Sequence, residues 1–319
     1  MVTLVVPVYN MEEHLIRCMG TLLNQTYTDY EIILVDDGST DRSSKLCDDY
    51  SHKNEKVRVI HKKNGGLSSA RNAGIQAACG DYIVFPDPDD WVEPNYVEQL
   101  LTCQEQYNAD LVCLGHYIEY DDRAIPANEN QKLCQMNQME ARRALLVAPT
   151  MGGFAWNKLY CLDIIRENNL CFENDVGTTE DLDFAYRYLG FCNNVCFAPE
   201  VRVYHYYQRA GAATHNGFSQ HKLESMHTYD KIIATSQDVG IISAAKEEIC
   251  NTATNLLWLY CKDHWQDPST KTKLKAYLRR NICDYLKSNR YGISRKAQVI
   301  CALISPEVYC FLKNKLTKG

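Results

Sequence analysis

Three carboxylates occur within four positions of the chain, in the stretch FPDPDDW at residues 85–91. Asp87, Asp89 and Asp90 directly follow the apolar run YIVF, and two prolines stand among them. Like charges this close repel one another, and a protein interior does not accommodate an unpaired carboxylate. One interpretation is a turn, because Asp and Pro are turn residues and Pro cannot continue a central strand. The other is a site for a divalent cation, which prefers carboxylate oxygens.

A second pair of carboxylates, Asp36 and Asp37, ends the apolar stretch YEIILV and opens the sequence DDGSTD. The Ser, Thr and Asp that follow are helix N-cap residues, so a helix start explains them. It does not explain the second carboxylate, for which a base edge or a ribose hydroxyl is a natural partner. The first apolar run ends in PVYN, which contains Pro7, Tyr9 and Asn10. The flat ring of Tyr9 is suited to stacking on a nucleobase.

Two further segments could bind phosphate or move a proton. The glycine-rich stretch NGGLSSARN at residues 64–72 leads into a helix that carries Arg71, and helix N-termini and guanidinium groups both favour phosphate. It is neither a Walker loop nor a GxGxxG fingerprint. Glu180 and Asp181 open an amphipathic helix in TTEDLDFAYRYL. Acids at a helix start often only compensate the helix dipole, but a carboxylate beside a metal site could also act as a general base.

A last polar segment, HYYQR, ends a strand-like run at residues 205–209. Arg209 and the tyrosines, Tyr207 among them, could hold a diphosphate. His205 could complete the coordination of a metal, although position alone supports that role and a lone His is more often structural.

The elements that must position these residues alternate between strand and helix in the first half of the chain. Apolar runs such as IILV and YIVF suit strands buried on both faces, and the spacing of βα units predicts an α/β fold with a mostly parallel central sheet and helices on both faces. Ligands of such sheets bind beyond the carboxyl ends of the strands, so we expect the polar segments to form one site. The rhythm breaks after residue 120, and from about Lys222 the pattern is helical. We therefore expect a catalytic domain over 1–215 and a helical region over 216–319.

Composition narrows the class of protein. The chain has 319 residues, of which 45% are hydrophobic and 23% charged, which is typical of a globular protein. No apolar run reaches the ~18 residues that span a bilayer, and the fifteen cysteines lack zinc-ligand spacing. Met1 leads directly into a strand-like run, so we expect no signal peptide and a cytoplasmic protein with reduced cysteines. The residues from Lys262 onward are basic although the net charge is -6, which indicates an anionic partner for the tail.

The polar segments together resemble family 2 glycosyltransferases with the GT-A fold. The motifs that carry the resemblance are PVYN, VDDGSTD, NGGLSSARNAG, a strand that ends in a DxD cluster, and the ED pair. They match in order and spacing over roughly residues 1–215. The block WNKLY at 156–160 is similar to members that build bacterial capsular polysaccharides and exopolysaccharides. The resemblance implies an inverting transfer of a sugar from a nucleotide donor, often a UDP-sugar, with Mn²⁺ or Mg²⁺.

Carried over position by position, the resemblance implies a role for each motif. The base would be held by Pro7, Tyr9 and Asp37, with Asp36 supporting that pocket and Arg71 approaching the nucleotide. Asp89 would be the principal metal ligand, Asp87 would face the ribose and the metal, and Asp90 would orient the donor sugar. Asp181 of the Glu180–Asp181 pair would be the catalytic base.

One stretch departs from the family pattern. Members of the family usually read closer to LDSDD where this chain reads PDPDD, so Pro86 and Pro88 replace an apolar and a small polar residue. Proline lacks an N–H and fixes φ near -65°, so any hydrogen bond of the amide at 88 is lost. We expect metal binding to survive and donor preference to differ.

The tail has two interpretations. The stretch at 297–316 joins apolar residues to lysines, as a helix at a membrane surface would, and a lipid-linked saccharide acceptor would place the enzyme at the inner leaflet. The same helices could instead pack on the catalytic domain or form a homodimer. We expect no nucleic acid partner. The loops at 116–135 and 150–178 would recognise the acceptor, and Trp156 is either a stacking surface for a sugar or a core residue.

Two other functions compete with the transferase. A non-catalytic nucleotide-sugar-binding subunit would not need both DxD aspartates and the ED pair. A sugar nucleotidyltransferase usually carries a glycine-rich, basic pyrophosphate loop near its N-terminus, which VVPVYNMEEHL lacks.

Overall fold

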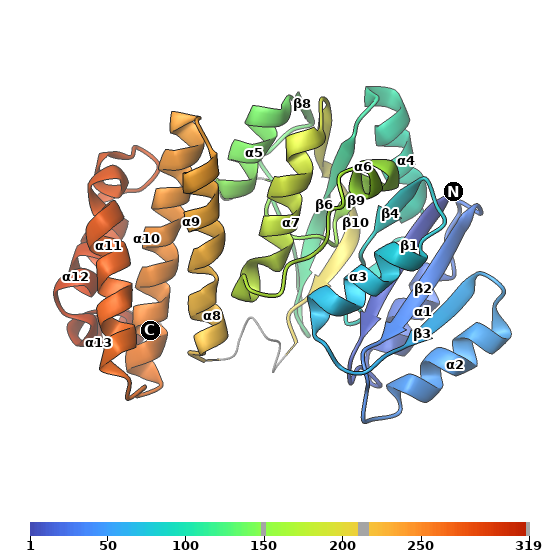
Figure 1. Ribbon diagram of the computed structural model, residues 1–319, viewed down its shortest axis with the longest axis horizontal. Coiled ribbons are helices and arrows are strands. Elements are labelled where there is room, and N and C mark those ends of the chain that lie inside the picture. The colour runs from blue at the N-terminus through green and yellow to red at the C-terminus, as the bar shows by residue number, and fades with distance from the viewer. Residues whose placement is uncertain (148–150, 210–216, 317–319) are drawn as a thin grey trace. The chain divides into compact units, whose positions relative to one another are not determined.

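The computed structural model of the chain describes residues 1–147, 151–209 and 217–316. The chain divides into two compact units. The first unit comprises Met1–Asn174 and Glu180–Ala210, and the second comprises Asp175–Thr179 and Gly211–Gly319. All of the polar segments that the sequence analysis singled out belong to the first unit (Figure 1).

The first unit alternates strands and helices along its first hundred residues, as the apolar periodicity predicts. Its elements up to residue 119 are β1 (Val2–Val8), α1 (Leu15–Leu22), β2 (Tyr30–Asp36), α2 (Ser43–Lys53), β3 (Val57–His61), α3 (Leu67–Ala77), β4 (Tyr82–Val84), β5 (Trp91–Val92), α4 (Tyr96–Tyr107) and β6 (Leu111–Glu119). Those that follow are β7 (Ala124–Pro126), β8 (Cys134–Met136), α5 (Gln138–Leu146), β9 (Lys158–Cys161), α6 (Leu162–Glu167), α7 (Glu180–Tyr188), the 3₁₀ turn η2 (Leu189–Phe191) and β10 (Val195–Tyr207).

The strands form a single mixed sheet in the order β3-β2-β1-β4-β9-β6-β10-β5, with β7 beside β6 and β8 beside β10. The half that begins at β3 is parallel through β4, and β6 is parallel to β10. β9 lies antiparallel between β4 and β6, and β5 closes the sheet antiparallel to β10. The expected α/β class is therefore confirmed, while the sheet is less parallel than expected beyond β4.

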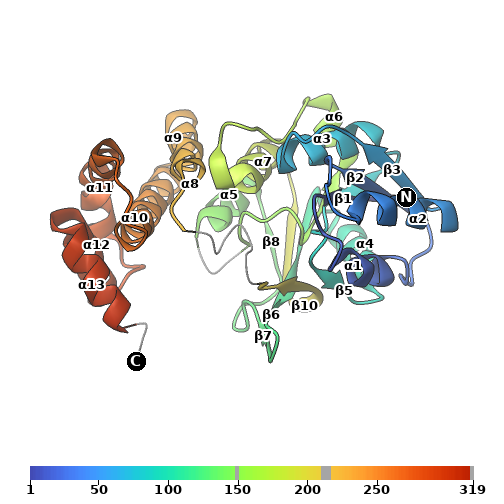
Figure 2. The ribbon, with the colours of Figure 1, turned by 90° about the horizontal axis from the view of Figure 1, so that it is seen from below.

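Helices cover both faces of the sheet, with α3, α6 and α7 on one side and α1 and α4 on the other (Figure 2). All of β1 is buried, as expected for a strand that is packed on both faces. Gly74 lets α3 approach β1 closely, because a Cβ at that position would lie 2.2 Å from a methyl carbon of Val5. The close approach fixes α3 against the sheet and so fixes Arg71, which lies about one turn earlier on the helix.

The stretch after residue 120, where the strand–helix rhythm breaks, contains β7 and β8, each of which adds a few pairs to a longer strand. Each of these strands has three residues, two of them exposed, which leaves no readable alternation in the sequence.

The second unit is helical, as the sequence predicts for the region from about Lys222. It contains the 3₁₀ turn η1 (Gly177–Thr179) and the helices α8 (Gln220–Glu224), α9 (Met226–Thr235), α10 (Val239–Lys262), α11 (Pro268–Lys287), α12 (Ile293–Ile304) and α13 (Pro306–Leu316). The buried face of α10 includes Ile249, Ala253, Leu256 and Tyr260, which recur at helical spacing. No helix in the described part of the chain combines the length and the apolar character needed to cross a membrane.

Candidate active site

The polar segments follow the carboxyl ends of neighbouring strands and are joined there by hydrogen bonds. The amide of Asp37, after β2, donates to the carbonyl of Val8 at the end of β1 (2.8 Å). The side chain of Asn10 accepts from the Thr40 amide (2.8 Å), and the Asn10 amide donates to Ser39 Oγ (3.1 Å). The segments after β1 and β2 therefore form one rim, as the topology predicts.

Tyr9 has a free ring in this rim. Its side chain is 46% exposed, whereas Pro7 stands opposite Val35 in the sheet. Asn10 holds a left-handed backbone conformation (φ 53°), which Asn adopts more readily than most residues and which turns the chain directly after Tyr9. An exposed aromatic ring on a fixed turn is available to stack on a planar ligand.

Asp37 binds the glycine-rich loop. It is buried and accepts hydrogen bonds from the amides of Gly65 (3.0 Å) and Gly66 (2.8 Å), and it forms an ion pair with Lys62. Gly66 needs its freedom here because its φ is +85°. The glycine loop is thus folded onto Asp37, so the carboxylate would have to bind a base with the lone pairs that these donors leave.

Asp36 is buried beside its neighbour and is paired with a residue that the sequence analysis missed. Its oxygens accept from the Ser39 amide (3.0 Å) and lie 2.9 Å from His61 Nδ1. Burial alone would raise the pKa of Asp36, but the hydrogen bonds from Ser39 and His61 outweigh it and lower the pKa. The hydrogen bonds to Asp36 and Asp48 raise the pKa of His61 in return. No sequence signal marked His61, which is the last residue of an ordinary strand.

Arg71 lies at the centre of the acidic residues. It is only 1% exposed and donates to Asp181 Oδ1 with one nitrogen and to Asp87 Oδ1 with another (3.1 Å), while Glu180 Oε1 lies 3.9 Å away. Burial would lower the pKa of Arg71, but the carboxylates of Asp181, Asp87 and Glu180 raise it. In this structure Arg71 forms a bridge between the DxD cluster and the ED pair, and its expected approach to a nucleotide stays a prediction.

The DxD cluster divides into one carboxylate that faces the site and one that is enclosed. Asp90 is buried and accepts hydrogen bonds from the Tyr204 hydroxyl (2.7 Å) and the Tyr207 amide (2.8 Å). Asp89 is partly exposed and pairs with Arg209 Nε (2.6 Å). The Tyr204 hydroxyl also accepts from the Asp87 amide (3.1 Å), so the end of β10 holds the cluster in shape.

The acids of this region carry more negative charge than their partners neutralise. Burial, aided by Asp89 and Asp181 and opposed by Arg71, raises the pKa of Asp87 to about 7. Burial and the charge of Asp181 raise the pKa of Glu180 to about 7. The pKa of Asp90 is also raised, by burial and by Asp87 and Asp89. Raised pKa values in a cluster of acids mean that an added cation would stabilise their charged forms.

The oxygens of Asp87 and Asp89 suit a hard divalent cation such as Mg²⁺ or Mn²⁺, and the excess of negative charge around them favours one. No group of three or more metal-ligating side chains is assembled in the described residues, and Arg71 and Arg209 are paired with one oxygen each of Asp87 and Asp89. His205 is paired with other acids. Its ring nitrogens are 2.7 Å from Glu119 and 3.1 Å from Glu93, so metal binding by His205 would require one of these pairs to break.

Two arginines and two aromatic residues surround Asp89. The guanidinium of Arg17 lies over the rings of Trp91 (3.9 Å) and Tyr207 (4.6 Å) and donates to the carbonyl of Asp89 (2.7 Å). The sequence analysis missed Arg17, which lies on the exposed face of an ordinary amphipathic helix. It fixes the backbone of Asp89 from α1, while Arg209 holds the side chain from the end of β10.

Trp156, for which two interpretations were open, is a core residue. It is 2% exposed and stacks on Tyr204 with ring centroids 4.6 Å apart. The amide of Ala155, its neighbour, donates to Asp181 Oδ2 (3.0 Å). The segment before β9 therefore contributes to the site through its backbone.

Comparison with known proteins identifies the class. Residues 3–160 match the model of glycosyl transferase family 2. The chain is 33% identical over 253 residues to EpsJ of Bacillus subtilis, which is described as an uncharacterized glycosyltransferase, and the match covers 78% of this chain and 73% of that protein.

Solved structures share the fold. The crystal structure of S. aureus TarS residues 1–349 in complex with UDP-GlcNAc superposes with a TM-score of 0.67 at 15% identity, over 97% of this chain and 88% of that one. A mannosyltransferase from Pyrobaculum calidifontis, in complex with GDP-Man and Mn²⁺, superposes with a TM-score of 0.59 at 14% identity, over 100% and 88%. The sheet described above is the GT-A fold of these enzymes, and the chain belongs to the family 2 glycosyltransferases.

Proposed function

We propose that the protein is an inverting glycosyltransferase that moves a sugar from a nucleotide-diphosphate donor, a UDP-sugar, to a hydroxyl of a saccharide acceptor. The observation that carries the proposal is the bridge of Arg71 between Asp87 and Asp181. It brings the acids suited to a cation and the acid suited to a general base within one side chain of each other. We further propose that the acceptor is lipid-linked and that the reaction belongs to the biosynthesis of a surface polysaccharide.

The donor would enter along the carboxyl ends of β1, β2 and β4. Tyr9 would stack on the base, Pro7 and Asn10 would shape that rim, and Asp37, with Asp36 behind it, would bind the base edge. The diphosphate would meet Arg209 and Tyr207 at the end of β10. Two of the solved neighbours bind UDP-GlcNAc and GDP-Man, which are donors of this kind.

Asp89 and Asp87 would hold Mn²⁺ or Mg²⁺. When bound, the metal supplies neutralisation of the charge that develops on the leaving diphosphate. Arg209 is paired with one oxygen of Asp89, and exchange of this pair for the metal would free Arg209 for the phosphates. Asp90 keeps its place through Tyr204 and the Tyr207 amide, and from there it would orient the donor sugar.

Asp181 would be the catalytic base. Its two oxygens are oriented by Arg71 and by the Ala155 amide, which leaves lone pairs for the proton of the acceptor hydroxyl. The acceptor oxygen forms a bond to the anomeric carbon as the bond to the diphosphate breaks, and the diphosphate leaves with the electron pair. This single displacement from the opposite face inverts the configuration. Glu180 precedes Asp181 in the first turn of α7 and lies near the same Arg71 guanidinium.

A donor-turnover experiment tests the proposal. Wild-type protein and Asp89→Ala would be incubated with a panel of nucleotide sugars, with and without Mn²⁺, and the released nucleotide identified. Metal-dependent release of UDP from one donor, lost in the variant, supports the proposal and names the sugar. Release of pyrophosphate would overturn it in favour of a nucleotidyltransferase. UDP binding without turnover, with every donor and with saccharide acceptors added, would favour a non-catalytic binding subunit.

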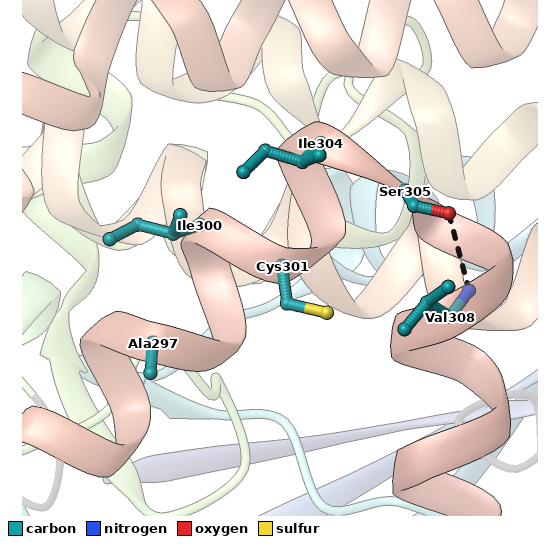
Figure 3. A pocket seen from close by; sticks show the side chains of 6 residues that line it. All are labelled: Ala297, Ile300, Cys301, Ile304, Ser305 and Val308. Carbon is teal, nitrogen blue, oxygen red and sulfur yellow. Dashed lines mark hydrogen bonds between the residues drawn. The ribbon is translucent and has the colours of Figure 1, made fainter.

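The tail supports a second part of the proposal, in which the second unit binds an anionic membrane surface. Large apolar side chains are exposed on α12 and α13, namely Ile293, Ile300, Ile304, Val308, Phe311 and Leu312. Ile300, Ile304 and Val308 line a shallow apolar hollow between these helices (Figure 3). Between Lys262 and the last residue, the sequence contains 13 Lys and Arg against 4 Asp and Glu. On an anionic membrane the apolar side chains would enter the interface, and the basic residues would attract the headgroups, each contributing about 1 kcal/mol.

Vesicle sedimentation tests the membrane contact in the full chain. We expect the wild type to pellet with phosphatidylcholine vesicles that contain phosphatidylglycerol and to remain in solution with phosphatidylcholine alone. Ile304→Glu should reduce pelleting, whereas Val239→Glu, at an exposed apolar residue on α10, should not. Failure of the wild type to pellet, or a concentration-dependent dimer that Ile304→Glu dissociates, would overturn this part in favour of a homodimer surface.

A further inference from the structure

An exposed aromatic residue directly precedes the amide that binds Asp181. Phe154 is 42% exposed, and the amide of the next residue, Ala155, donates to Asp181 Oδ2 (3.0 Å). One peptide unit therefore separates the backbone of Phe154 from the group that holds this carboxylate. The sequence analysis assigned the possible stacking role to Trp156, whose ring is buried. The open ring is the one two residues earlier.

The Phe154 ring is supported on one side by other aromatic rings. It stacks on Trp156 with centroids 5.1 Å apart and planes 21° from parallel, and Tyr206 lies 6.3 Å away at 33°. Trp156 is in turn stacked on Tyr204, the residue that donates to Asp90. His116 also contacts the Phe154 ring in a T-shaped arrangement (6.4 Å), and a Cβ on Gly152 would lie 3.0 Å from it, so the exposed area is the part of the ring that these neighbours leave uncovered.

The backbone before Phe154 fits only a narrow space. A Cβ on Gly153 would lie 2.8 Å from Cβ of Leu182, the residue after Asp181. Gly152 adopts a φ of +63°, which suits glycine. The two glycines therefore bring this segment against the start of α7 and place Phe154 at its surface.

A buried lysine fixes the same segment. Lys158 is fully buried and donates to the carbonyls of Phe154 (2.6 Å) and Met151 (3.3 Å) and to Asn157 Oδ1 (3.0 Å). Within the described residues it has no ion-pair partner, so its charge is compensated by backbone dipoles. A buried ammonium is costly unless it is well hydrogen-bonded, and here its bonds close the turn that presents Phe154.

We propose that Phe154 is the surface on which a sugar ring of the acceptor stacks, so that an acceptor hydroxyl reaches Asp181, and that Lys158 positions it. The inference rests on the proposed function and specifies how its acceptor is bound. The ligand class is a pyranose with one apolar face of C–H groups, which a flat ring can cover while the hydroxyls at the rim remain hydrated. Phe154 would thus select for the shape of the acceptor sugar and take no part in donor binding.

The test uses the full-length protein and three variants. Phe154→Ala removes the ring, Phe154→Tyr keeps it, and Phe191→Ala removes an equally exposed ring that is on η2. Binding of methyl glycosides of glucose, galactose, mannose and N-acetylglucosamine is measured by saturation-transfer NMR at about 10 mM, because a single stacking contact supports only weak affinity. Hydrolysis of the donor by water is measured in parallel.

We expect at least one methyl glycoside to bind the wild type, with the signal lost in Phe154→Ala and kept in Phe154→Tyr and Phe191→Ala. Donor hydrolysis should stay within about twofold in all three variants, because water needs no stacking surface. Binding that persists in Phe154→Ala would overturn the inference, and so would the absence of binding of every glycoside to the wild type. Donor hydrolysis would still support the transferase in either case. Phe154-dependent binding without donor hydrolysis would support the platform and count against the proposed reaction.

Discussion

Two groups of carboxylates in this protein are held in opposite ways. Asp36 and Asp37, at the end of β2, accept hydrogen bonds from backbone amides and pair with His61 and Lys62. The acids after β4 and at the start of α7 instead face one another across Arg71, and the pKa of Glu180 is raised to about 7. The charges of the first group are balanced by partners within the protein. The second has more charge than its partners balance.

The contrast separates carboxylates whose charge is balanced locally from carboxylates that lack balancing charge. A carboxylate with several local donors organises a loop, and it does so whether or not a ligand is bound. Carboxylates that repel one another favour a bound cation or a transferred proton, which is how acids are tuned at functional sites. We therefore expect substitutions in the two groups to affect different properties, and the predictions below run from the largest expected effect to the smallest.

The largest effect is expected for Asp181→Asn, which removes the proposed base. The turnover number should fall by about 10²–10⁴-fold, as for loss of a general base, while UDP affinity changes little. Steady-state kinetics and calorimetry measure the two quantities. Asp183→Asn is the matched control, since Asp183 lies on the same helix but pairs with Arg187. Equal losses of turnover in both variants would contradict the role of Asp181.

Arg71→Met should destabilise the fold by about 3–5 kcal/mol, because it leaves Asp87, Asp181 and Glu180 without their shared counter-charge. Urea unfolding measures the change in the free energy of unfolding. Arg42→Met is the control at an exposed ion pair with Glu12, where the loss should be below about 1 kcal/mol. A small loss at Arg71 would mean that the acids are not in excess, and the contrast between the two groups would fail.

Asp37→Asn and Asp90→Asn compare the two groups directly. Asp37 has charge-assisted bonds, so its amide variant should cost about 1–3 kcal/mol of folding free energy. Asp90 is buried beside two other acids with a raised pKa, so its amide variant should lie within about 1 kcal/mol of wild type. Thermal and urea unfolding without metal measure both. The reverse order would show that the charge of Asp90 is the better compensated.

The smallest effect concerns the pair of His61 and Asp36. The raised pKa of His61 gives a stabilisation that is complete below its ordinary value of 6.5 and is lost as pH rises through the folded value. The lowered pKa of Asp36 gives one that is present above 3.8 and is lost as pH falls. His61→Gln should therefore lose stability chiefly between these values, by less than about 1 kcal/mol, because His61 is 43% exposed. The difference in melting temperature between wild type and His61→Gln is measured at pH 5.5 and at pH 8.5. A larger difference at pH 8.5 would contradict the pairing.

Local patterns in the sequence were sufficient to predict the strands and helices, and to predict that polar residues at the strand ends lie together. Apolar runs predicted β1, β2 and β4, and polar residues at the ends of parallel strands predicted that Tyr9, Asp37 and Asp87 would share one edge of the sheet. The sheet topology explains this success, because it follows from repeated βα units. The roles of these residues in binding and catalysis remain predictions.

The pairings across the site could not be predicted in the same way. Arg71 meets Asp181 over a separation of 110 residues, Tyr204 meets Asp90 over 114, and Arg17 meets the carbonyl of Asp89 over 72. No local periodicity encodes such contacts. Trp156 and Phe154 show the same limit, because composition does not tell which of two aromatic residues in a short segment faces the core.

The pairing of β10 with β6 is interrupted by a bulge after Ala198, which determines where this strand can change in length. Ala198 pairs with Leu114, but Arg202 already pairs with Gly115, so the residues between them are extra. They pass so close to Gly115 that a Cβ there would lie 2.0 Å from the carbonyl oxygen of Pro199. An inserted residue can be absorbed in this irregular stretch, whereas one inserted after Tyr204 would exchange the two faces of the strand. Natural or engineered length variation should therefore collect at 199–201 and spare the end of β10 that holds Asp90.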